Sequence, residues 1–458
     1  MFFERLQSLN SRACFPRTGC RKDSLWRILL RVRAVLLLGV TACLLIVPHC
    51  FADSLVKPIA HPRTPAEVEF QKGYEALEAN RLADAEVAFR RSSQLDPRLT
   101  SALLGLAEIR MRKGDAAGAG PFLQKAAAVA PKNVEVQATW GHYLFFRQRY
   151  DEALKVLNAA VRLDPKMARP HYELGDLYLL GLKKPQLSVA AYREALAIDP
   201  KNARFHYSLA NALAETGQID QAQSEMEEAV RLEPNDAPLM KWYGDFQLRR
   251  GRPDQAMDSF AKALAIDPHY VPALVAQGDV LAQRKQFDQA LGKYQEALKI
   301  APQSAEVYAR MGLLYEAQQR WSDAEQAYTK ATEADPNLAV AWNNLAWLLA
   351  EREKQIARAL TLARKAVALA PQNADYQDTL GWILRENGEK DGALTALKKA
   401  AQLAPQNPQI LYHLGVVYQE KGLSQAAAQS LKKALGISKN FEGAQDAEGR
   451  LAALGPQK

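Results

Sequence analysis

The sequence predicts an all-α solenoid, in which helix–turn–helix units stack one after another along a line. Three observations support this prediction. The chain has 458 residues, which is too many for one compact core unless its elements stack in a row. Small residues stand five, twelve and 24 or 25 residues before a recurrent proline in unit after unit. That proline recurs every 34 or 35 residues, as Pro97, Pro131, Pro165, Pro200, Pro234, Pro268, Pro302, Pro336, Pro371 and Pro405.

Each position of the unit has a physical reason. Small residues let the two helices approach closely, and the proline ends the second helix because it has no backbone N–H to donate. Short polar side chains mark the expected helix starts, where an oxygen can cap free backbone N–H groups. The expected caps of second helices are Asp151, Asp220, Asp254, Asp288, Ser322 and Asp391. The expected caps of first helices are Asn133, Asn202, Ser304, Asn373 and Asn407.

The two ends of the repeated region have their own signals. Residues 53–65 contain three prolines and are predicted to form an extended linker. Thr64, Pro65 and Glu67 then provide a cap, a first-turn proline and a capping-box glutamate, so the first helix is expected to begin here. At the other end, residues 441–454 space their apolar residues at helical intervals. Residues 441–458 are therefore expected to form a capping helix and a tail.

The 34-residue unit resembles the tetratricopeptide repeat (TPR). Eleven such repeats fit residues 66–440 in register, although the eleventh has Lys439 in place of the proline. The resemblance implies a right-handed superhelix, in which the first helices of the repeats line a concave groove. The chain also resembles exported bacterial TPR proteins that accompany envelope assembly and exopolysaccharide export.

Residues 1–52 have the pattern of a secretory signal peptide. A basic region ending at Arg33 is followed by the apolar run from Ala34 to Val47, and Cys50 and Ala52 are small residues at the two key positions before Asp53. We therefore expect cleavage after Ala52 and a location in the periplasm.

Two alternatives to cleavage remain open. Residues 27–47 could stay as an uncleaved anchor that tethers the chain to the inner membrane, although the apolar run is shorter than the ~20 residues of a spanning helix. Alternatively, the stretch that ends at Cys43 resembles a lipobox, with Cys43 as the lipidated residue.

Charge and cysteine content argue against two classes of function. The formal charge is +8, but residues 1–33 carry +6 of it, so the repeated region gives no electrostatic footprint for nucleic acid. A TPR-type RNA binder is therefore the least favoured alternative. All four cysteines lie in the first 50 residues, which leaves the repeats without a thiol nucleophile or thiolate metal ligand.

No catalytic residues, metal site or cofactor are predicted, because only linker and cap flank the repeats. His171 and His206 occupy equivalent positions in neighbouring repeats, in the helix-packing slot that Trp342 fills further on. We interpret them as partly buried packing residues. A metal site is the alternative, but no third ligand lies near them in the sequence.

The second, fifth and ninth residues of each repeat are those expected to face the groove. In repeats two to seven the ninth position carries carboxylates, an amide and one histidine, whereas repeats nine and ten carry Trp347 and Trp382. An exposed tryptophan pair is typical of an interface anchor, and packing inside the superhelix is the alternative. The predicted partner-binding residues are Asn343, Asn344, Trp347, Asp378, Trp382, Tyr172, Asp176, Tyr207, Asn211 and Asp245.

The sequence therefore predicts a non-catalytic scaffold that binds a protein or peptide segment, in envelope assembly or polysaccharide export. The alternative is a glycan-binding or enzyme-associated module of the envelope. In that case Tyr172, Tyr207, Asp176 and Asp245 would hold sugar.

Overall fold

The computed structural model describes residues 55–455, which form α-helices and one π-helical segment and contain no β-strand. The all-α solenoid fold is confirmed. The predicted signal peptide, the tether at residues 27–47 and Cys43 all lie outside the described residues. None of the helices within residues 55–455 combines the length and apolar character that crossing a membrane requires. The described chain divides into two compact units, residues 55–270 and 271–455.

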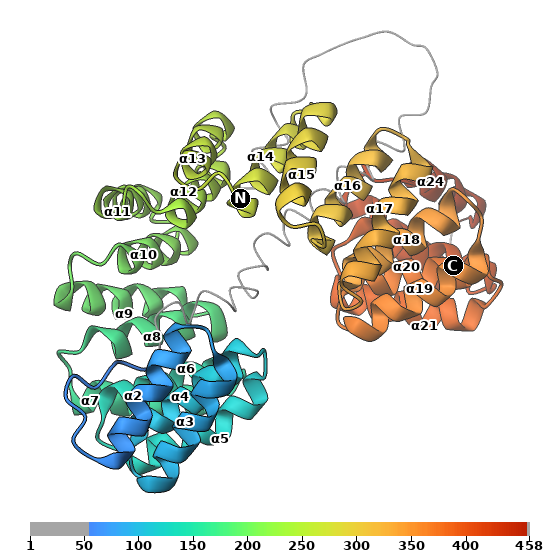
Figure 1. Cartoon of the computed structure of the whole chain (residues 1–458). Coiled ribbons are helices and arrows are strands. Elements are labelled where there is room, and N and C mark those ends of the chain that lie inside the picture. Colours follow the sequence, from blue (N-terminus) through green and yellow to red (C-terminus); the bar gives the residue numbers. More distant parts are fainter. Residues whose placement is uncertain (1–54, 456–458) are drawn as a thin grey trace. The chain divides into compact units, whose positions relative to one another are not determined.

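The N-terminal unit consists of six helix pairs, in which each helix packs against the next along the chain (Figure 1). The pairs are α2 (Pro65–Glu78) with α3 (Leu82–Leu95), α4 (Thr100–Arg112) with α5 (Ala116–Val129), α6 (Val134–Phe146) with α7 (Tyr150–Leu163), α8 (Ala168–Asp176) with α9 (Pro185–Ile198), α10 (Ala203–Glu215) with α11 (Ile219–Leu232), and α12 (Ala237–Arg249) with α13 (Pro253–Ile266).

The C-terminal unit has five further pairs and a final single helix. The pairs are α14 (Val271–Gln283) with α15 (Phe287–Ile300), α16 (Ala305–Ala317) with α17 (Trp321–Ala334), α18 (Ala339–Glu351) with α19 (Ile356–Leu369), α20 (Ala374–Glu386) with α21 (Lys390–Leu403), and α22 (Pro408–Glu420) with α23 (Ser424–Ile437). The final helix is α24 (Ala444–Ala453). Eleven pairs in the described chain match the eleven predicted repeats.

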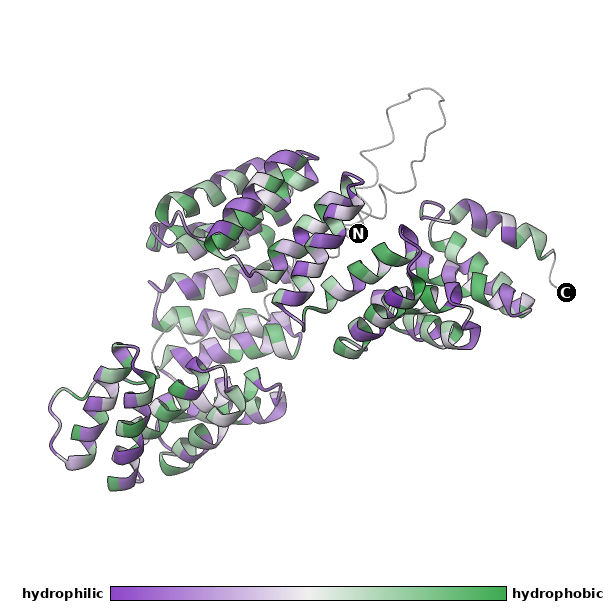
Figure 2. Ribbon diagram, turned by 45° about the vertical axis from the view of Figure 1, so that its right-hand side comes forward, coloured by the Kyte–Doolittle hydropathy of each residue, from purple (hydrophilic) through white to green (hydrophobic). Residues whose placement is uncertain are grey.

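The recurrent small residues and prolines act as the sequence predicts. A Cβ added at Gly312 would lie 2.4 Å from the Tyr328 ring, and one at Gly73 would lie 2.6 Å from the Phe89 ring. Glycine at this position therefore lets an aromatic residue of the second helix lie against the backbone of the first helix. Every second helix that precedes a recurrent proline ends two residues before it, as α3 does at Leu95 before Pro97. The helices carry both apolar and hydrophilic residues, and the apolar ones form the core between helices (Figure 2).

Helix capping follows the prediction at the first helices but not at the second. Thr64 and Glu67 form the predicted capping box, and Asn133, Asn202, Asn373 and Asn407 each accept a backbone N–H. Ser304 stands at the cap position without a side-chain bond. The predicted caps of second helices are wrong, because these helices begin one residue before the short polar residue. The second helical position is held by Asp151, Asp220, Asp254, Asp288, Ser322 and Asp391. There an aspartate complements the positive end of the helix dipole instead of capping it.

The two 35-residue repeats accommodate their extra residue in different places. In the fourth repeat the first helix widens at its C-terminal end into a π-helical turn, Leu177–Gly181. In the ninth repeat the extra residue lies in the turn after Glu351, where Lys354 has a φ of 56°. Of these two repeats, only the fourth has an irregular helical turn beside a buried charged group, because the π-helical turn directly follows Asp176.

The final helix α24 covers the end of the last repeat, as predicted. Its start depends on Gly443, which has a φ of 88° and whose added Cβ would lie 2.4 Å from the Tyr412 ring. Phe441 packs against the same ring at a centroid distance of 5.9 Å. The Tyr412 hydroxyl donates to Asp446 of α24 at 2.8 Å. Burial, followed by the Asp446 hydrogen bond, raises the pKa of Tyr412 to about 12, so the hydroxyl stays a donor.

Candidate functional site

The polar candidates of the fourth repeat form a buried network around Tyr172. Its ring stacks on Phe205 at 5.0 Å, and its hydroxyl accepts a hydrogen bond from Arg204 Nε at 3.1 Å. Asp176 lies one helical turn away and accepts from the Tyr192 hydroxyl. Burial, and then the charge of Glu173, raise the pKa of Asp176 to about 6. Both candidates, Tyr172 and Asp176, are thus held by neighbours within the unit.

A buried ion pair adjoins this network. His142 Nδ1 of α6 lies 2.5 Å from Glu173 Oε2 of α8, and both side chains are buried. Burial opposes ionisation of Glu173, but the charge and hydrogen bond of His142 hold its pKa below the usual value. Arg169 adds a weaker contact at 3.6 Å. The pair connects the third and fourth repeats.

The remaining candidates of the N-terminal unit are half-buried and also contact neighbours. Tyr207 stacks on Trp242 with ring centroids 4.5 Å apart. Asn211 accepts a hydrogen bond from Arg249 at 2.7 Å, and Asp245 pairs with Lys241 at 2.7 Å. The first two contacts link the fifth repeat to the sixth, whereas Lys241 and Asp245 both lie on α12 of the sixth repeat.

In the C-terminal unit, Trp347 is more enclosed than the sequence suggests. Its side chain is only 8% exposed, so the expectation of two exposed tryptophans is wrong for Trp347. The cause is the position of α18, which packs against α17 and α19 and also against α20. Every residue from Asn343 to Ala350 is consequently buried.

Asn343 and Asn344 differ from the other candidates because each keeps a buried atom without a partner. Their side chains are 6% and 3% exposed, and the Asn343 amide donates to Asn344 Oδ1 at 3.3 Å. Asn343 Oδ1 and Asn344 Nδ2 have no hydrogen-bond partner among residues 55–455. One unpaired acceptor and one unpaired donor therefore lie together on α18. Leaving such groups unpaired costs about 1–3 kcal/mol each.

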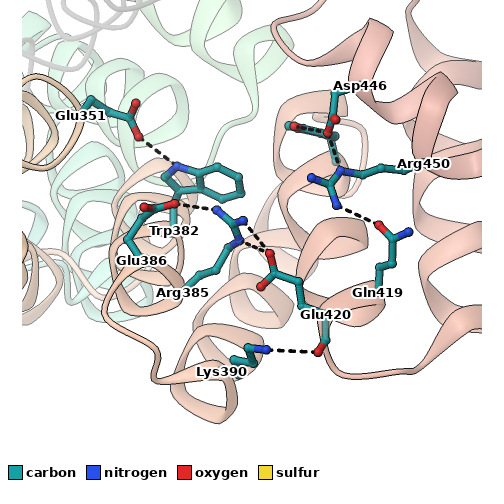
Figure 3. Close-up of polar contacts among 10 residues, drawn as sticks. Glu351, Trp382, Arg385, Glu386, Lys390, Gln419, Glu420, Asp446 and Arg450 are labelled. Carbon is teal, nitrogen blue, oxygen red and sulfur yellow. Dashed lines mark hydrogen bonds and ion pairs between the residues drawn. The ribbon is translucent and has the colours of Figure 1, made fainter. Parts of the chain in front are cut away.

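Trp382 is the centre of a polar and aromatic cluster between α20 and α22 (Figure 3). Its Nε1 donates to Glu351 at 3.0 Å, and its half-buried ring stacks on His413 at 4.1 Å. The Arg385 guanidinium lies 4.5 Å over the same ring and also bonds Glu420. Cation–π contact and stacking hold the indole in place.

Asp378 is buried beneath this cluster and is held by the same histidine. His413 Nδ1 lies 2.8 Å and 2.9 Å from the two Asp378 carboxylate oxygens. The other ring nitrogen of His413 lies 2.8 Å from the Gln409 side-chain nitrogen. The structure thus brings Asp378 and Trp382 together through His413, which sequence reasoning missed.

The packing-slot residues have a common polar role that sequence analysis did not recognise. His171, His206 and Trp342 each donate to the carbonyl of the recurrent proline six residues earlier, at 3.1, 3.1 and 2.9 Å. Tyr308 and Gln377 do the same in their repeats. The fixed spacing of donor and proline was a usable signal. No group of three or more His, Cys, Asp or Glu within the described chain could hold a metal ion.

Sequence reasoning also missed that the segment 55–59 packs on the first two repeats. Leu55 N donates to Glu108 Oε2 at 2.9 Å, and Ile59 N donates to Gln71 Oε1 at 3.1 Å. Val56, between them, is 3% exposed. Residues 55–59 form neither helix nor strand, and they bind side chains of α2 and α4.

Comparison with repeat profiles gives matches along both units. Profiles described as tetratricopeptide repeat or TPR repeat match residues 70–134, 139–203, 179–241, 327–361, 381–422 and 408–441. A profile of the middle TPR-like domain of cilia and flagella-associated protein 70 matches residues 235–335.

Three proteins with related sequences are cellulose synthase operon proteins C. The one from Komagataeibacter xylinus is 30% identical over 122 residues, which cover 24% of this chain and 9% of that protein. Cellulose synthase 1 operon protein C of the same organism is 28% identical over 140 residues, or 27% of this chain and 10% of that protein. The protein from Komagataeibacter sucrofermentans is also 30% identical over 122 residues, which cover 24% of this chain and 9% of that protein. The chain thus spans about a tenth of the length of these relatives.

Among solved structures, yeast Tom70 is similar with a TM-score of 0.48 and 15% identity, covering 85% of this chain and 95% of that one. The Cut9–Hcn1 tetramer of APC/C gives a TM-score of 0.47 and 16% identity, with coverages of 86% and 97%. YrrB, a TPR protein with an unusual peptide-binding site, is similar with a TM-score of 0.35 and 23% identity. The match covers 42% of this chain and 99% of that one.

The repeat profiles together match residues 70–441 except for residues 135–138 and 362–380. The eleven helix pairs follow the same 34-residue period, with a glycine or alanine where the two helices meet. The chain belongs to the tetratricopeptide repeat proteins.

Proposed function

We propose that this protein is an exported, non-catalytic scaffold that binds an extended segment of another envelope protein on the first helices of its repeats. A TPR fold supports a protein-binding adaptor. The observation that carries the site is the unpaired acceptor and donor of Asn343 and Asn344. A peptide unit offers one N–H donor and one C=O acceptor, and could therefore satisfy both amides at once after a small side-chain rotation.

The surroundings of the two asparagines fit a peptide better than a sugar. The cluster of Trp382, Arg385 and His413 lies on α20 and α22, and α20 packs directly on α18. The half-buried indole provides apolar surface on α20, beside Glu351 at the C-terminal end of α18. In the N-terminal unit, by contrast, the Tyr172 ring is buried against Phe205 and offers no open face for a sugar to stack on.

Two observations favour a place in the envelope. Residues 1–52 have the basic, apolar and small-residue pattern of a signal peptide, which we propose directs the chain to the periplasm. The related proteins are named for the cellulose synthase operon, which supports the proposed role in polysaccharide export. An anchor at residues 27–47 or lipidation at Cys43 would tether the same scaffold to a membrane. Sequencing the mature N-terminus distinguishes these three cases.

In-cell photocrosslinking tests the binding site. A photoreactive residue at Asp375, which is exposed on α20, should form an adduct with a partner protein in the native host. The matched control is Lys365, which is exposed on the second helix α19. We expect an adduct from position 375 only, and its loss in the N343L/N344L double variant. Adducts that survive this double substitution would contradict the proposed site.

A further inference from the structure

The segment Leu55–Ile59, here called the strap, binds the N-terminal unit in the way a peptide ligand would. It has neither helix nor strand of its own, and Val56 is buried in the core cluster that contains Phe70, Phe89 and Leu106. Ile59 packs against the same cluster. Leu55 packs against a second cluster, formed by Ala107, Leu123 and Tyr143.

The polar contacts of the strap come from side chains of the first helices. Glu108 of α4 and Gln71 of α2 accept the backbone N–H groups of Leu55 and Ile59. Glu108 is only 4% exposed, and its other oxygen is held by Arg112 at 2.6 Å. A buried carboxylate fixed in this way is set to accept an N–H from an extended backbone.

These contacts define which ligand residues the surface recognises. Three aliphatic side chains are partly or fully buried, at the first, second and fifth positions of the strap, whereas Lys57 and Pro58 between them are exposed. The recognised features are therefore two adjacent aliphatic residues, a third one three positions later, and backbone N–H groups at the first and fifth positions. A bound peptide commonly has some side chains held in pockets and others left in solvent.

We propose that this surface of α2 and α4 is a second peptide-binding site, which the strap occupies in cis and which an extended partner segment of the same pattern occupies by displacing it. The strap is joined to α2 by only residues 60–64, so its effective concentration at the site is in the mM range expected for a short linker. A partner segment must therefore bind strongly enough to displace a strap that is present at this effective concentration. The strap thus sets a threshold for binding at the N-terminal unit, in addition to the site proposed on α18.

Binding of the strap sequence in trans tests this proposal. The probe is a fluorescein-labelled synthetic peptide with the sequence of residues 53–62, and the readout is fluorescence anisotropy with the full-length chain. Val56→Asp places a charge in the apolar core contact and should release the strap, so the V56D chain should bind the peptide at least ~10-fold more tightly than the unmodified chain. The control, Lys57→Asp, places the same carboxylate at an exposed strap position, although it also removes the lysine charge, and should leave the weak binding unchanged.

Two further variants test the site itself. In the V56D background, Gln71→Met removes the acceptor for one backbone N–H and should weaken peptide binding about tenfold. Glu108→Gln alters the buried acceptor of the other N–H and is the harsher change. Circular dichroism melting shows whether the E108Q variant folds. If E108Q does not fold, the Q71M result alone decides the test. A labelled peptide with aspartate at the Val56 position should not bind any variant.

The opposite outcomes are equally clear. If the V56D chain and the unmodified chain both ignore the peptide, the strap is a fixed part of the fold and the proposal is wrong. If sedimentation shows that the unmodified chain dimerises and V56D does not, the strap is exchanged between copies, which also overturns it. The assay needs no native partner, so the N343L/N344L chain should bind the peptide as the parent does. If the strap proposal fails in this assay, the site proposed on α18 is not affected.

Discussion

Two groups of polar candidates, one in each unit, differ in how completely their side chains are paired. In the N-terminal unit the candidates Tyr172, Asp176 and Asn211 all have partners supplied by neighbouring helices. In the C-terminal unit Asn343 and Asn344 bond each other and leave one acceptor and one donor unpaired. Both sets are at least partly enclosed, so burial alone does not separate them.

The difference separates a structural network from a binding site. A satisfied buried network fixes one arrangement of neighbouring repeats, and removing a member exposes the charge of another. An unsatisfied pair costs the free protein stability and becomes favourable only when a ligand supplies the missing groups. Substitutions in the two regions should therefore have opposite patterns of effect on stability and on binding.

The largest expected effect is at the buried ion pair of the N-terminal unit. His142→Ala removes the group that lies 2.5 Å from Glu173 and leaves this carboxylate buried with only the longer Arg169 contact. We expect a loss of about 3–5 kcal/mol in the unfolding free energy of α6 and α8. Hydrogen exchange followed by mass spectrometry measures it helix by helix. His171→Ala is the matched control, because it loses one hydrogen bond, worth about 1 kcal/mol, to the Pro165 carbonyl. Equal losses in the two variants would show that the ion pair has no special role.

The next effect is a pH dependence centred on Asp176. Its pKa of about 6 lies above the ordinary value of 3.8, chiefly because the carboxyl is buried. The stability it contributes is therefore present below about pH 4 and is lost as the pH rises through 6, a change of about 3 kcal/mol. Asp176→Asn keeps an acceptor for the Tyr192 hydroxyl and cannot ionise. The melting temperature of this variant should exceed that of the parent at pH 8, and the two should converge near pH 4. Parallel curves across this range would refute the assignment.

The local, repeated parts of the fold could be read from the sequence. Gly312 and Tyr328 stand sixteen residues apart like other glycine–aromatic pairs, so their contact is encoded within one repeat. The second-helix caps were misplaced because an aspartate at the second helical position resembles a cap when only spacing is known. This error shifts a boundary by one or two residues and leaves the fold intact.

Contacts between distant residues were the part that sequence could not supply. The strap is bound by Glu108, 53 residues away from Leu55, and nothing periodic marks this contact. Trp347 is buried because α18 touches α20 as well as its own partner helix. The pair of His142 and Glu173 comes from different positions of adjacent repeats. Aligning equivalent positions of the repeats shows which residue type stands at each one. It does not show which neighbouring residue that side chain will contact.

A smaller effect is expected at the tryptophan of the C-terminal cluster. Trp382→Phe removes the hydrogen bond to Glu351 and keeps an aromatic ring above His413. We expect a loss of about 1 kcal/mol, since one hydrogen bond is lost and the stacking remains. Exchange rates in α20 measure it, with Trp342→Phe, which loses the bond to the Pro336 carbonyl, as the reference. A loss several times that of the reference would mean that the indole fills a space that phenylalanine cannot.

The smallest effect on stability, and the most informative, is expected at the two asparagines. The N343L/N344L double variant replaces both members of a pair by apolar side chains of similar size, and it gives up one 3.3 Å hydrogen bond while removing two unpaired polar atoms. Its unfolding free energy should stay within about 1 kcal/mol of the parent in urea titrations. Asn373→Leu, in the same unit, is the control that should lose about 1 kcal/mol, because Asn373 caps α20 through the N–H groups of Asp375 and Tyr376. If the double variant loses more than the capping variant, the two amides are part of the structural framework and α18 is not a binding site. If it keeps its stability while the crosslink from position 375 disappears, the asparagines serve the ligand and not the fold.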